Sequence, residues 1–579
     1  MALQFESSLQ NLVYQVDAGT GRKVIQVVLF ALFAFAMGAL YTFSNFQGLK
    51  DERAMDYAQI AQNFAMDGEM TTRCVRPLSM WKVAELSPDG DAALLSHPDL
   101  FHPPVWPTLL SGALWLSGSP RTGEPTTAFV YGWDYIPVAL NHLFTALSAI
   151  WVWLIGRKLF DRRVGALSAG AFLISDLVWQ QSLLGADLAA ATFFCLGAVY
   201  TALWAAELPE GAAPGKEQGP IWRWILPLVL SALLTGLAFL TRYAAGSIAL
   251  LIFLYLGASR RNRSWAKASL YIGLTVLLVL PWLARNVALS GNPFGLVFHE
   301  MLSGTYLFPG DALMRSIHPE MPDPGAAFYA VQIKMVSNLR AFIASGFGMA
   351  NAGLLLGLFG AMYFHRFMRP SSRVLRWCMV PAAALLVLFA SAFGEDSLRA
   401  LTIFWPLAIP YGWAFFLILL DRLQFEVRFL DTAALAIVMF LTGLPLLLNV
   451  LPPNTGIPYP PYFHRYAGWV GSMVEPEECL TTDMPWATAW YGGATSILLP
   501  RNIDGFYEID GKIHPIALAY FTTLTRDKPW VRSLADPSAP EFSWYQVFAD
   551  GKVPGNFPLT QGRFIAGSDQ LVLADRPRW

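Results

Sequence analysis

Charged side chains are scarce in this chain of 579 residues. Asp, Glu, Lys and Arg together make up only 14% of the sequence, whereas 55% of the residues are hydrophobic. An ordinary soluble domain has about 25% charged residues, so this composition excludes that class. It favours a protein that lies largely in a lipid bilayer.

Cysteine is also rare, with four residues in the whole chain. No pair has a C-x-x-C spacing or a Cys/His spacing, so a disulfide framework and a zinc site are both excluded. The chain also lacks a Walker A loop and a Gly-rich dinucleotide loop. We therefore expect no cofactor, and the sequence leaves a need for a divalent metal open.

Long apolar runs are what the sequence does contain. A membrane-spanning helix needs roughly 20 predominantly apolar residues. The first run, Val24–Phe43, follows Arg22 and Lys23 and continues past the length of a signal peptide, so we interpret it as a retained anchor. Ten more runs bring the expected number of transmembrane helices to about eleven: Tyr135–Gly156, Val164–Trp179, Leu188–Ala205, Trp224–Leu240, Ala244–Leu256, Leu270–Ala284, Phe342–Phe364, Trp377–Phe393, Leu401–Leu420 and Thr432–Leu451.

Short basic loops predict the orientation, because Lys and Arg are retained on the cytoplasmic side. The clusters lie at 157–163, 260–267, 366–376 and 422–428. With eleven spans and a cytoplasmic N-terminus at 1–23, all four fall inside. We therefore expect a multi-pass protein of the bacterial cytoplasmic (inner) membrane whose C-terminal part is extracytoplasmic.

The predicted domains are a transmembrane domain at 24–451, with outer loops at 45–134 and 285–341, and an extracytoplasmic domain at 452–579. The apolar run Val105–Ser117 is short for a span and is expected to lie at the outer interface. The Pro-rich stretch Pro452–Pro461 marks the domain boundary. Two short strands, Glu478–Thr482 and Thr495–Leu499, favour a small α/β fold after it.

In this topology Cys74 and Cys479 lie outside, where an oxidising compartment permits a bond between them. The stretch Thr482–Tyr491 between the two strands is rich in aromatic residues. It is expected to be core or membrane-contacting, with binding of an acceptor as the alternative.

Acidic residues at the predicted outer rim are candidate functional residues, because such charges are costly near the bilayer. Asp51, Glu52 and Asp56 follow the first span, and Glu52 and Asp56 share a face if a helix begins early. Asp187 lies alone between two apolar runs. The structural alternative is that Asp51 and Asp56 cap a helix and Asp187 occupies a tight turn.

Three outer cations complement these carboxylates: Arg242, Arg285 and Arg399. Each alone is equally well explained by an arginine that extends from the bilayer to the interface. Together with the acidic residues they suit a phosphate-bearing lipid whose head group is held next to a general base.

Several short motifs occur in an order that resembles a known family. They include Asp51-Glu52, the run Asp56–Asn63, Phe101-His102-Pro103-Pro104, the basic stretch Gly156–Arg163, Asp187, Leu240–Tyr243 and Pro281–Asn286. Over roughly residues 20–450 the chain resembles membrane glycosyltransferases of the GT-C fold, and most of all the protein O-mannosyltransferases and the lipid A aminoarabinose transferases.

The resemblance implies transfer of a hexose or pentose from a polyprenyl-phosphate donor to a lipid, glycan or protein acceptor at the outer face of the membrane. It implies an acidic base in the first loop, either Asp56 or Asp51, with Asp187 as a second catalytic carboxylate. The substrate-binding residues would be Glu52, Tyr57, His102, Arg242, Arg285 and Arg399. A lipid phosphate leaves as a stable anion, so an inverting displacement needs one base and cations, but no general acid.

Two other functions remain open at this stage. A transporter or flippase of lipid-linked sugars would show inverted repeats and charged residues near the midplane, and the sequence shows neither. A non-catalytic envelope assembly protein would use the outer domain for binding. Membrane lipids are expected partners in every case, and no nucleic acid is expected.

Overall fold

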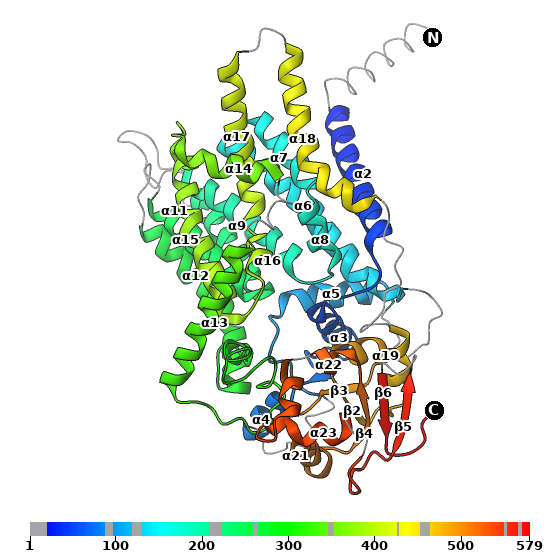
Figure 1. The fold of residues 1–579 in the computed structure, drawn as a ribbon. Coiled ribbons are helices and arrows are strands. Elements are labelled where there is room, and N and C mark those ends of the chain that lie inside the picture. Colours follow the sequence, from blue (N-terminus) through cyan, green and yellow to red (C-terminus); the bar gives the residue numbers. More distant parts are fainter. Residues whose placement is uncertain are drawn as a thin grey trace, which may run out of the picture.

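The computed structural model describes residues 20–86, 96–118, 130–207, 222–258, 265–345, 353–424, 428–451, 464–527, 529–548, 553–565 and 570–579. A helical bundle occupies one end of the molecule, and a layer of strands and short helices occupies the other (Figure 1). The bundle contains α2 (Thr20–Asn45), α6 (Tyr135–Leu159), α7 (Arg162–Leu173), α8 (Asp176–Leu183), α9 (Leu188–Glu207), α10 (Trp222–Thr241), α11 (Ser247–Ala258), α12 (Trp265–Ser290), α14 (Gly353–Ala361), α15 (Pro370–Phe393), α16 (Ser397–Leu401), α17 (Trp405–Leu423) and α18 (Arg428–Val450).

Eight helices in the described part of the chain are long and apolar enough to cross a membrane: α2, α6, α9, α10, α12, α15, α17 and α18. The three other predicted spans are not continuous long helices in the described part of the chain. The run from Val164 is divided between α7 and α8 at Ser175, and α11 has 12 residues. The predicted span Phe342–Phe364 lies partly outside the described residues, and its described parts include the end of α13 (Pro324–Ala344) and the nine residues of α14. The expected helical polytopic membrane fold is confirmed, with the long spans concentrated in eight helices.

Close helix packing in the bundle depends on small residues. A side-chain Cβ at Gly156 of α6 would lie 2.9 Å from Gly165 Cα of α7, which is closer than real Cβ contacts allow. Without side chains at these two positions the helices can approach backbone to backbone. This contact fixes the turn around Asp161, which caps α7 by accepting from Val164 N at 2.8 Å.

Two of the predicted cytoplasmic clusters lie together at the same end of the bundle. Arg369 donates to the backbone oxygen of Lys158 at 3.3 Å, and Ser372 donates to that of Leu159 at 2.8 Å. This end of α6 and α7 is opposite the end that carries the sheet (Figure 1). The arrangement agrees with a shared side for these two clusters.

The elements at the other end are α3 (Glu52–Asp67), α4 (Pro77–Leu86), α5 (Val105–Leu116), α13 (Pro324–Ala344), α19 (His464–Gly471), α20 (Pro485–Gly492), α21 (Ile503–Glu508), α22 (Thr523–Asp527), α23 (Tyr545–Phe548) and six strands. The strands are β1 (Cys74–Val75), β2 (Cys479–Thr482), β3 (Thr495–Leu498), β4 (Ile516–Phe521), β5 (Gln561–Ile565) and β6 (Gln570–Ala574). The predicted helix after the first span and both predicted strands are therefore present.

The sheet has the order β1-β3-β2-β4-β6-β5. Strands β1 to β4 run parallel, while β6 is antiparallel to both β4 and β5. Its edge strand β1 belongs to the first outer segment, so that segment and the C-terminal region share one sheet. The predicted linker Pro452–Pro461 lies outside the described residues.

The bond between Cys74 and Cys479 that the sequence permits is not formed. All four cysteines are free and buried. Cys74 lies on β1 and Cys479 on β2, and β3 runs between them. Since neighbouring strands are about 4.8 Å apart, two strand spacings exceed the reach of a disulfide, about 7 Å between Cα atoms.

Candidate functional site

Helix α3 carries the first candidate base, and its ends are well defined. Asp51 is its N-cap and accepts from Arg53 N at 3.1 Å and Ala54 N at 3.3 Å. Gly68 ends the helix with a φ of 74°, a left-handed conformation that glycine adopts without strain. Every residue from Ala54 to Asn63 is buried, so the polar side chains of α3 need partners within the protein.

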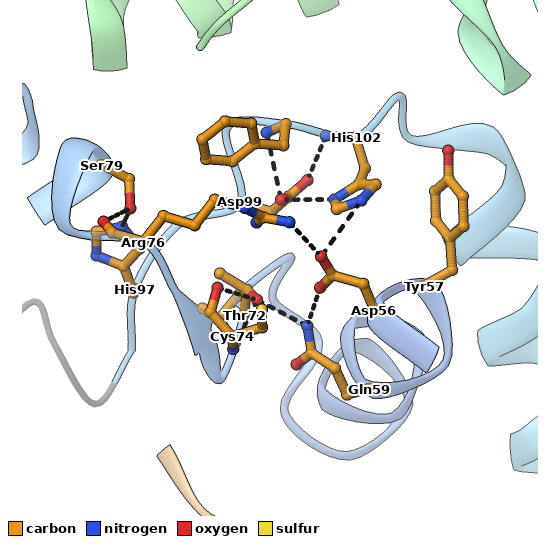
Figure 2. Close-up of polar contacts among 12 residues, drawn as sticks. Asp56, Tyr57, Gln59, Thr72, Cys74, Arg76, Ser79, His97, Asp99 and His102 are labelled. Carbon is orange, nitrogen blue, oxygen red and sulfur yellow. Dashed lines mark hydrogen bonds and ion pairs between the residues drawn. The ribbon is translucent and has the colours of Figure 1, made fainter. Parts of the chain in front are cut away.

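The Asp56 carboxylate is buried, with 2% of the residue exposed, and both of its oxygens have partners. Arg76 donates to Oδ2 at 2.8 Å, and His102 Nε2 lies 3.5 Å from the same oxygen. Gln59, one turn along α3, donates to Oδ1 at 2.9 Å. Figure 2 shows Asp56 between these three side chains, which fix the orientation of its carboxylate. Gln59 is itself held, because it also donates to Thr72 at 2.7 Å.

His102 connects Asp56 to a second carboxylate, Asp99. The ring nitrogen Nδ1 of His102 is 3.0 Å from Asp99 Oδ1, and its backbone N–H donates to Asp99 Oδ2 at 3.0 Å (Figure 2). Burial alone would lower the pKa of His102, but Asp99 and Asp56 outweigh it and raise this pKa. Burial alone would raise the pKa of Asp99, but His102 outweighs it and lowers that pKa. The row Asp99, His102, Asp56 therefore favours a cationic imidazole between two carboxylates.

Asp187 belongs to a second charged network beside the first. Arg242 donates to Asp187 at 3.0 Å and also to Glu395, and Arg53 donates to Glu395 at 2.9 Å. Tyr57, next to Asp56 on α3, donates to Asp187 at 3.3 Å. Burial alone would raise the pKa of Glu395, but Arg242 and Arg53 outweigh it and lower this pKa to about 2. Glu395 is therefore ionised at neutral pH.

Two neighbouring cavities contact these networks. The larger has a volume of about 480 Å³ and is lined by Glu52, Arg53, Asp56, Arg76, Glu300, Ser303, Gly304, Gly310, Asp311, Met314, Lys334, Asn338, Phe393, Gly394 and Trp486. The smaller has about 70 Å³ and is lined by Arg53, Tyr57, Arg76, Phe101, His102, Pro103, Asp187, Arg242, Tyr243, Ala244, Val297, Glu300, Phe389, Phe393 and Glu395. Arg53, Arg76, Glu300 and Phe393 line both cavities, so the two spaces meet there.

Most of the site residues expected from the sequence line these two cavities. Glu52 and Asp56 line the larger one, as a shared face of one helix predicts. The smaller one is lined by Tyr57, His102, Asp187 and Arg242. Residues from α3, the loop before α5, the turn before α9 and the end of α10 thus meet although they are far apart in the sequence.

Three expected site residues do not line either cavity. Asp51 caps α3 and accepts from Arg399 at 2.7 Å, and Arg399 also donates to Gln181 at 3.2 Å. Arg285 donates to the backbone oxygen of Asp99 at 3.0 Å and lies over the Trp282 ring. The structural alternative therefore describes Asp51 well, since it is a helix cap.

The sequence reasoning missed five residues that line the cavities or hold their walls: Arg53, Arg76, Asp99, Glu300 and Glu395. Arg53 directly follows the quoted pair Asp51-Glu52, Glu395 stands four residues before the expected site residue Arg399, and both are charged residues in predicted outer segments. Arg76 and Glu300 had no spacing signal, because Arg76 takes its role from Asp56 in another segment and Glu300 from its place between the two cavities. Asp99 contacts His102 three residues later, so its closeness to the quoted motif was the signal that could have found it. In the described part of the chain, no three His, Cys, Asp or Glu residues lie close enough to hold a metal ion.

Comparison with known proteins supports the resemblance. The sequence model of the family described as dolichyl-phosphate-mannose-protein mannosyltransferase matches residues 136–284, which include Asp187 and Arg242. No curated protein sequence matches the chain. The structure is similar to that of ArnT from Cupriavidus metallidurans bound to undecaprenyl phosphate, with a TM-score of 0.54 and 14% identity, over 97% of this chain and 99% of that chain.

The structure is also similar to the oligosaccharyltransferase of Archaeoglobus fulgidus tethered with an acceptor peptide. The TM-score is 0.55 and the identity 12%, over 86% of this chain and 69% of that chain. At these identities the likeness to solved structures shows the fold alone. Together with the family match, it confirms the predicted resemblance to the membrane glycosyltransferases of the GT-C fold.

Proposed function

We propose that this protein is a membrane glycosyltransferase that moves a sugar from a polyprenyl-phosphate donor to an acceptor at the outer face of the membrane. The observation that carries the proposal is the position of Asp56. Its carboxylate lies on the wall of a 480 Å³ cavity that meets a smaller, arginine-lined cavity at Arg53 and Arg76. The fold shared with an ArnT bound to undecaprenyl phosphate supports a lipid phosphate as part of the donor.

The smaller cavity is the proposed place of the donor phosphate. Arg53, Arg76 and Arg242 line it, and guanidinium groups bind phosphate oxygens well. The Nε–H of Arg242 is buried and has no hydrogen-bond partner among the residues that the structure describes. Since a buried donor without a partner is costly, this group is suited to a phosphate oxygen that completes its hydrogen bonds.

The proposed reaction is a single inverting displacement. The acceptor oxygen or nitrogen forms a bond to the anomeric carbon while the bond from that carbon to the phosphate oxygen breaks. The bonding electrons leave with the lipid phosphate, whose charge the arginines stabilise, and the acceptor's proton passes to Asp56. We assign the base to Asp56 rather than Asp51, because Asp51 is engaged in the helix cap and the pair with Arg399.

Asp187 is proposed to position Arg242 and Tyr57, to both of which it is hydrogen-bonded. His102 and Asp99 are proposed to hold Asp56 in place from the other side. The outer-face direction rests on the basic clusters, since those around Lys158 and Arg369 lie at the end of the bundle opposite the sheet.

Binding of undecaprenyl phosphate to the purified protein tests the donor half of this proposal. Arg242→Gln is expected to weaken binding at least tenfold relative to wild type. Arg285→Gln changes an outer arginine that lines neither cavity and should stay within about twofold of wild type. Equal binding by the two variants, or no binding by the wild type, would contradict a phosphate site beside Arg242.

A further inference from the structure

Several carboxylates that line the two cavities are already paired with other side chains. Asp56 has partners on both oxygens, and Asp187 and Glu395 are each paired with arginine. An acceptor group that approaches Asp56 must therefore share an oxygen that is already hydrogen-bonded. One hydrogen bond to Asp56 alone would hold such a group loosely.

Glu300 lies where the two cavities meet and lines both of them. Its carboxylate has no hydrogen-bond or ion-pair partner within the residues that the structure describes. It is half-buried, in the 3-10 helix Val297–Met301 of the outer segment between α12 and α13. Its charge acts on Arg53 and Arg76, although it forms no ion pair with either.

The backbone around Glu300 is fixed although its carboxylate is not engaged. Lys334 of α13 donates to the backbone oxygens of Glu300 at 2.9 Å, Met301 at 3.2 Å and Ser303 at 2.6 Å. An ammonium group has three N–H donors, so Lys334 is fully used in holding this segment. The Glu300 carboxylate is thereby kept at the junction of the two cavities and can accept hydrogen bonds from a ligand.

The larger cavity has features that suit a sugar unit. About 480 Å³ is within the usual range of small-molecule sites, roughly 300 to 1,000 Å³. Its walls are mostly polar or charged, and they include Trp486 from α20 of the C-terminal region. Carboxylates only accept hydrogen bonds, so Glu300 and Asp56 require a ligand with more than one donor. Neighbouring hydroxyl groups of a saccharide supply such donors.

We propose that the acceptor is a saccharide bound in the larger cavity and that Glu300 holds it there. This inference rests on the proposed function and adds the class of acceptor. One acceptor hydroxyl attacks the anomeric carbon of the donor and passes its proton to Asp56. A neighbouring hydroxyl of the same sugar donates a hydrogen bond to Glu300, which keeps its charge throughout. Glu300 therefore contacts the acceptor and not the donor phosphate.

The test compares wild type with Glu300→Gln and with Glu320→Gln, an exposed glutamate on the same outer segment. Three quantities are measured: the affinity of the purified proteins for undecaprenyl phosphate, their melting temperature, and the surface glycans of cells that lack the native protein and produce each variant at equal levels. Glu300→Gln should lose at least tenfold in glycan transfer, keep its affinity within about twofold and melt as wild type does. Glu320→Gln should match wild type in all three. Linkage analysis should find the added sugar on another sugar.

Three results would overturn the inference alone. The first is full transfer by Glu300→Gln in cells where wild type is active, and the second is an added sugar that is attached to Ser or Thr. A parallel loss of transfer and of undecaprenyl phosphate affinity in Glu300→Gln would also overturn it, since Glu300 would then serve the donor. A wild type that neither binds undecaprenyl phosphate nor changes any glycan would overturn the proposed function, and this inference with it.

Discussion

Asp134 accepts a hydrogen bond of 2.8 Å from the indole N–H of Trp490, although 356 positions separate the two residues. Tyr491 donates to the other oxygen of Asp134 at 3.0 Å, and so does Leu49 N at 3.3 Å. Asp134 precedes α6, whereas Trp490 and Tyr491 lie on α20. One buried carboxylate thus joins the bundle to the C-terminal region directly beside α3, which packs against α20.

Asp134→Ala is expected to loosen this junction. Trp490 and Tyr491 would each lose the acceptor of a buried hydrogen bond, and each donor left without a partner costs about 1–3 kcal/mol. Hydrogen exchange should therefore become faster in α20 and in β1. Asp536→Ala, which changes an exposed aspartate whose side chain accepts hydrogen bonds from Ser538, serves as the control. Unchanged exchange in α20 would show that Asp134 does not hold the junction.

Glu395→Gln is expected to destabilise the protein by about 3–5 kcal/mol at neutral pH, because it removes the carboxylate that pairs with both Arg53 and Arg242. The pKa of Glu395 lies below its ordinary value, at about 2. Its contribution to stability is therefore present above about pH 4.5 and is lost as the pH falls towards 2. The difference in melting temperature between variant and wild type should therefore be smaller at pH 3 than at pH 7. A constant difference across this range would contradict an ionised Glu395.

His102→Gln should show the opposite pH dependence. The pKa of His102 is raised above its ordinary value of 6.5 by Asp99 and Asp56. The stabilisation that comes from its charge is therefore complete below about pH 6.5 and is lost as the pH rises through the raised pKa. The difference in melting temperature between wild type and His102→Gln should shrink at alkaline pH. His318→Gln, which changes an exposed histidine that pairs with Glu508, serves as the control variant.

The topology can be tested by labelling single cysteines with a membrane-impermeant maleimide in intact cells. Ser472→Cys, at an exposed position after α19, should be labelled from outside. Arg162→Cys, in the basic cluster at the start of α7, should be labelled only after the membrane is permeabilised. The reverse pattern, or equal labelling, would show that the chain crosses the membrane with a different count or orientation.

The sequence predicted the parts of the fold that depend on local patterns. Apolar length identified α2, α6 and the other long helices, and two short runs on either side of the aromatic stretch Thr482–Tyr491 identified β2 and β3. It did not predict β1, because two residues carry no periodic signal and this strand exists only through its pairing with β3. It also did not predict that the run from Val164 breaks at Ser175, since the apolar character continues through the break.

The site residues that the sequence predicted are those with a local signal, which was a shared helix, a quoted motif or a charge at the predicted outer rim. Glu52, Asp56 and Tyr57 lie on one helix, and His102 stands in a quoted motif. Charge alone could not separate Asp56 from Asp51. The two differ only in the folded chain, where Asp51 caps α3 and Asp56 lines the larger cavity. Likewise Arg242 and Arg399 are similar outer arginines in the sequence, but only Arg242 reaches the network that contains Asp187.

The most direct test of the account is a comparison of lipid-linked sugars and surface glycans in three kinds of cell: cells without the protein, cells that produce wild type, and cells that produce Asp56→Asn at the same level. Asn keeps the size and polarity of Asp but cannot take a proton from an acceptor. The account predicts that one glycan modification is lost without the protein and restored by wild type, but not by Asp56→Asn, while its lipid-linked sugar accumulates. Full restoration by Asp56→Asn, or glycans that are identical in all three, would contradict it.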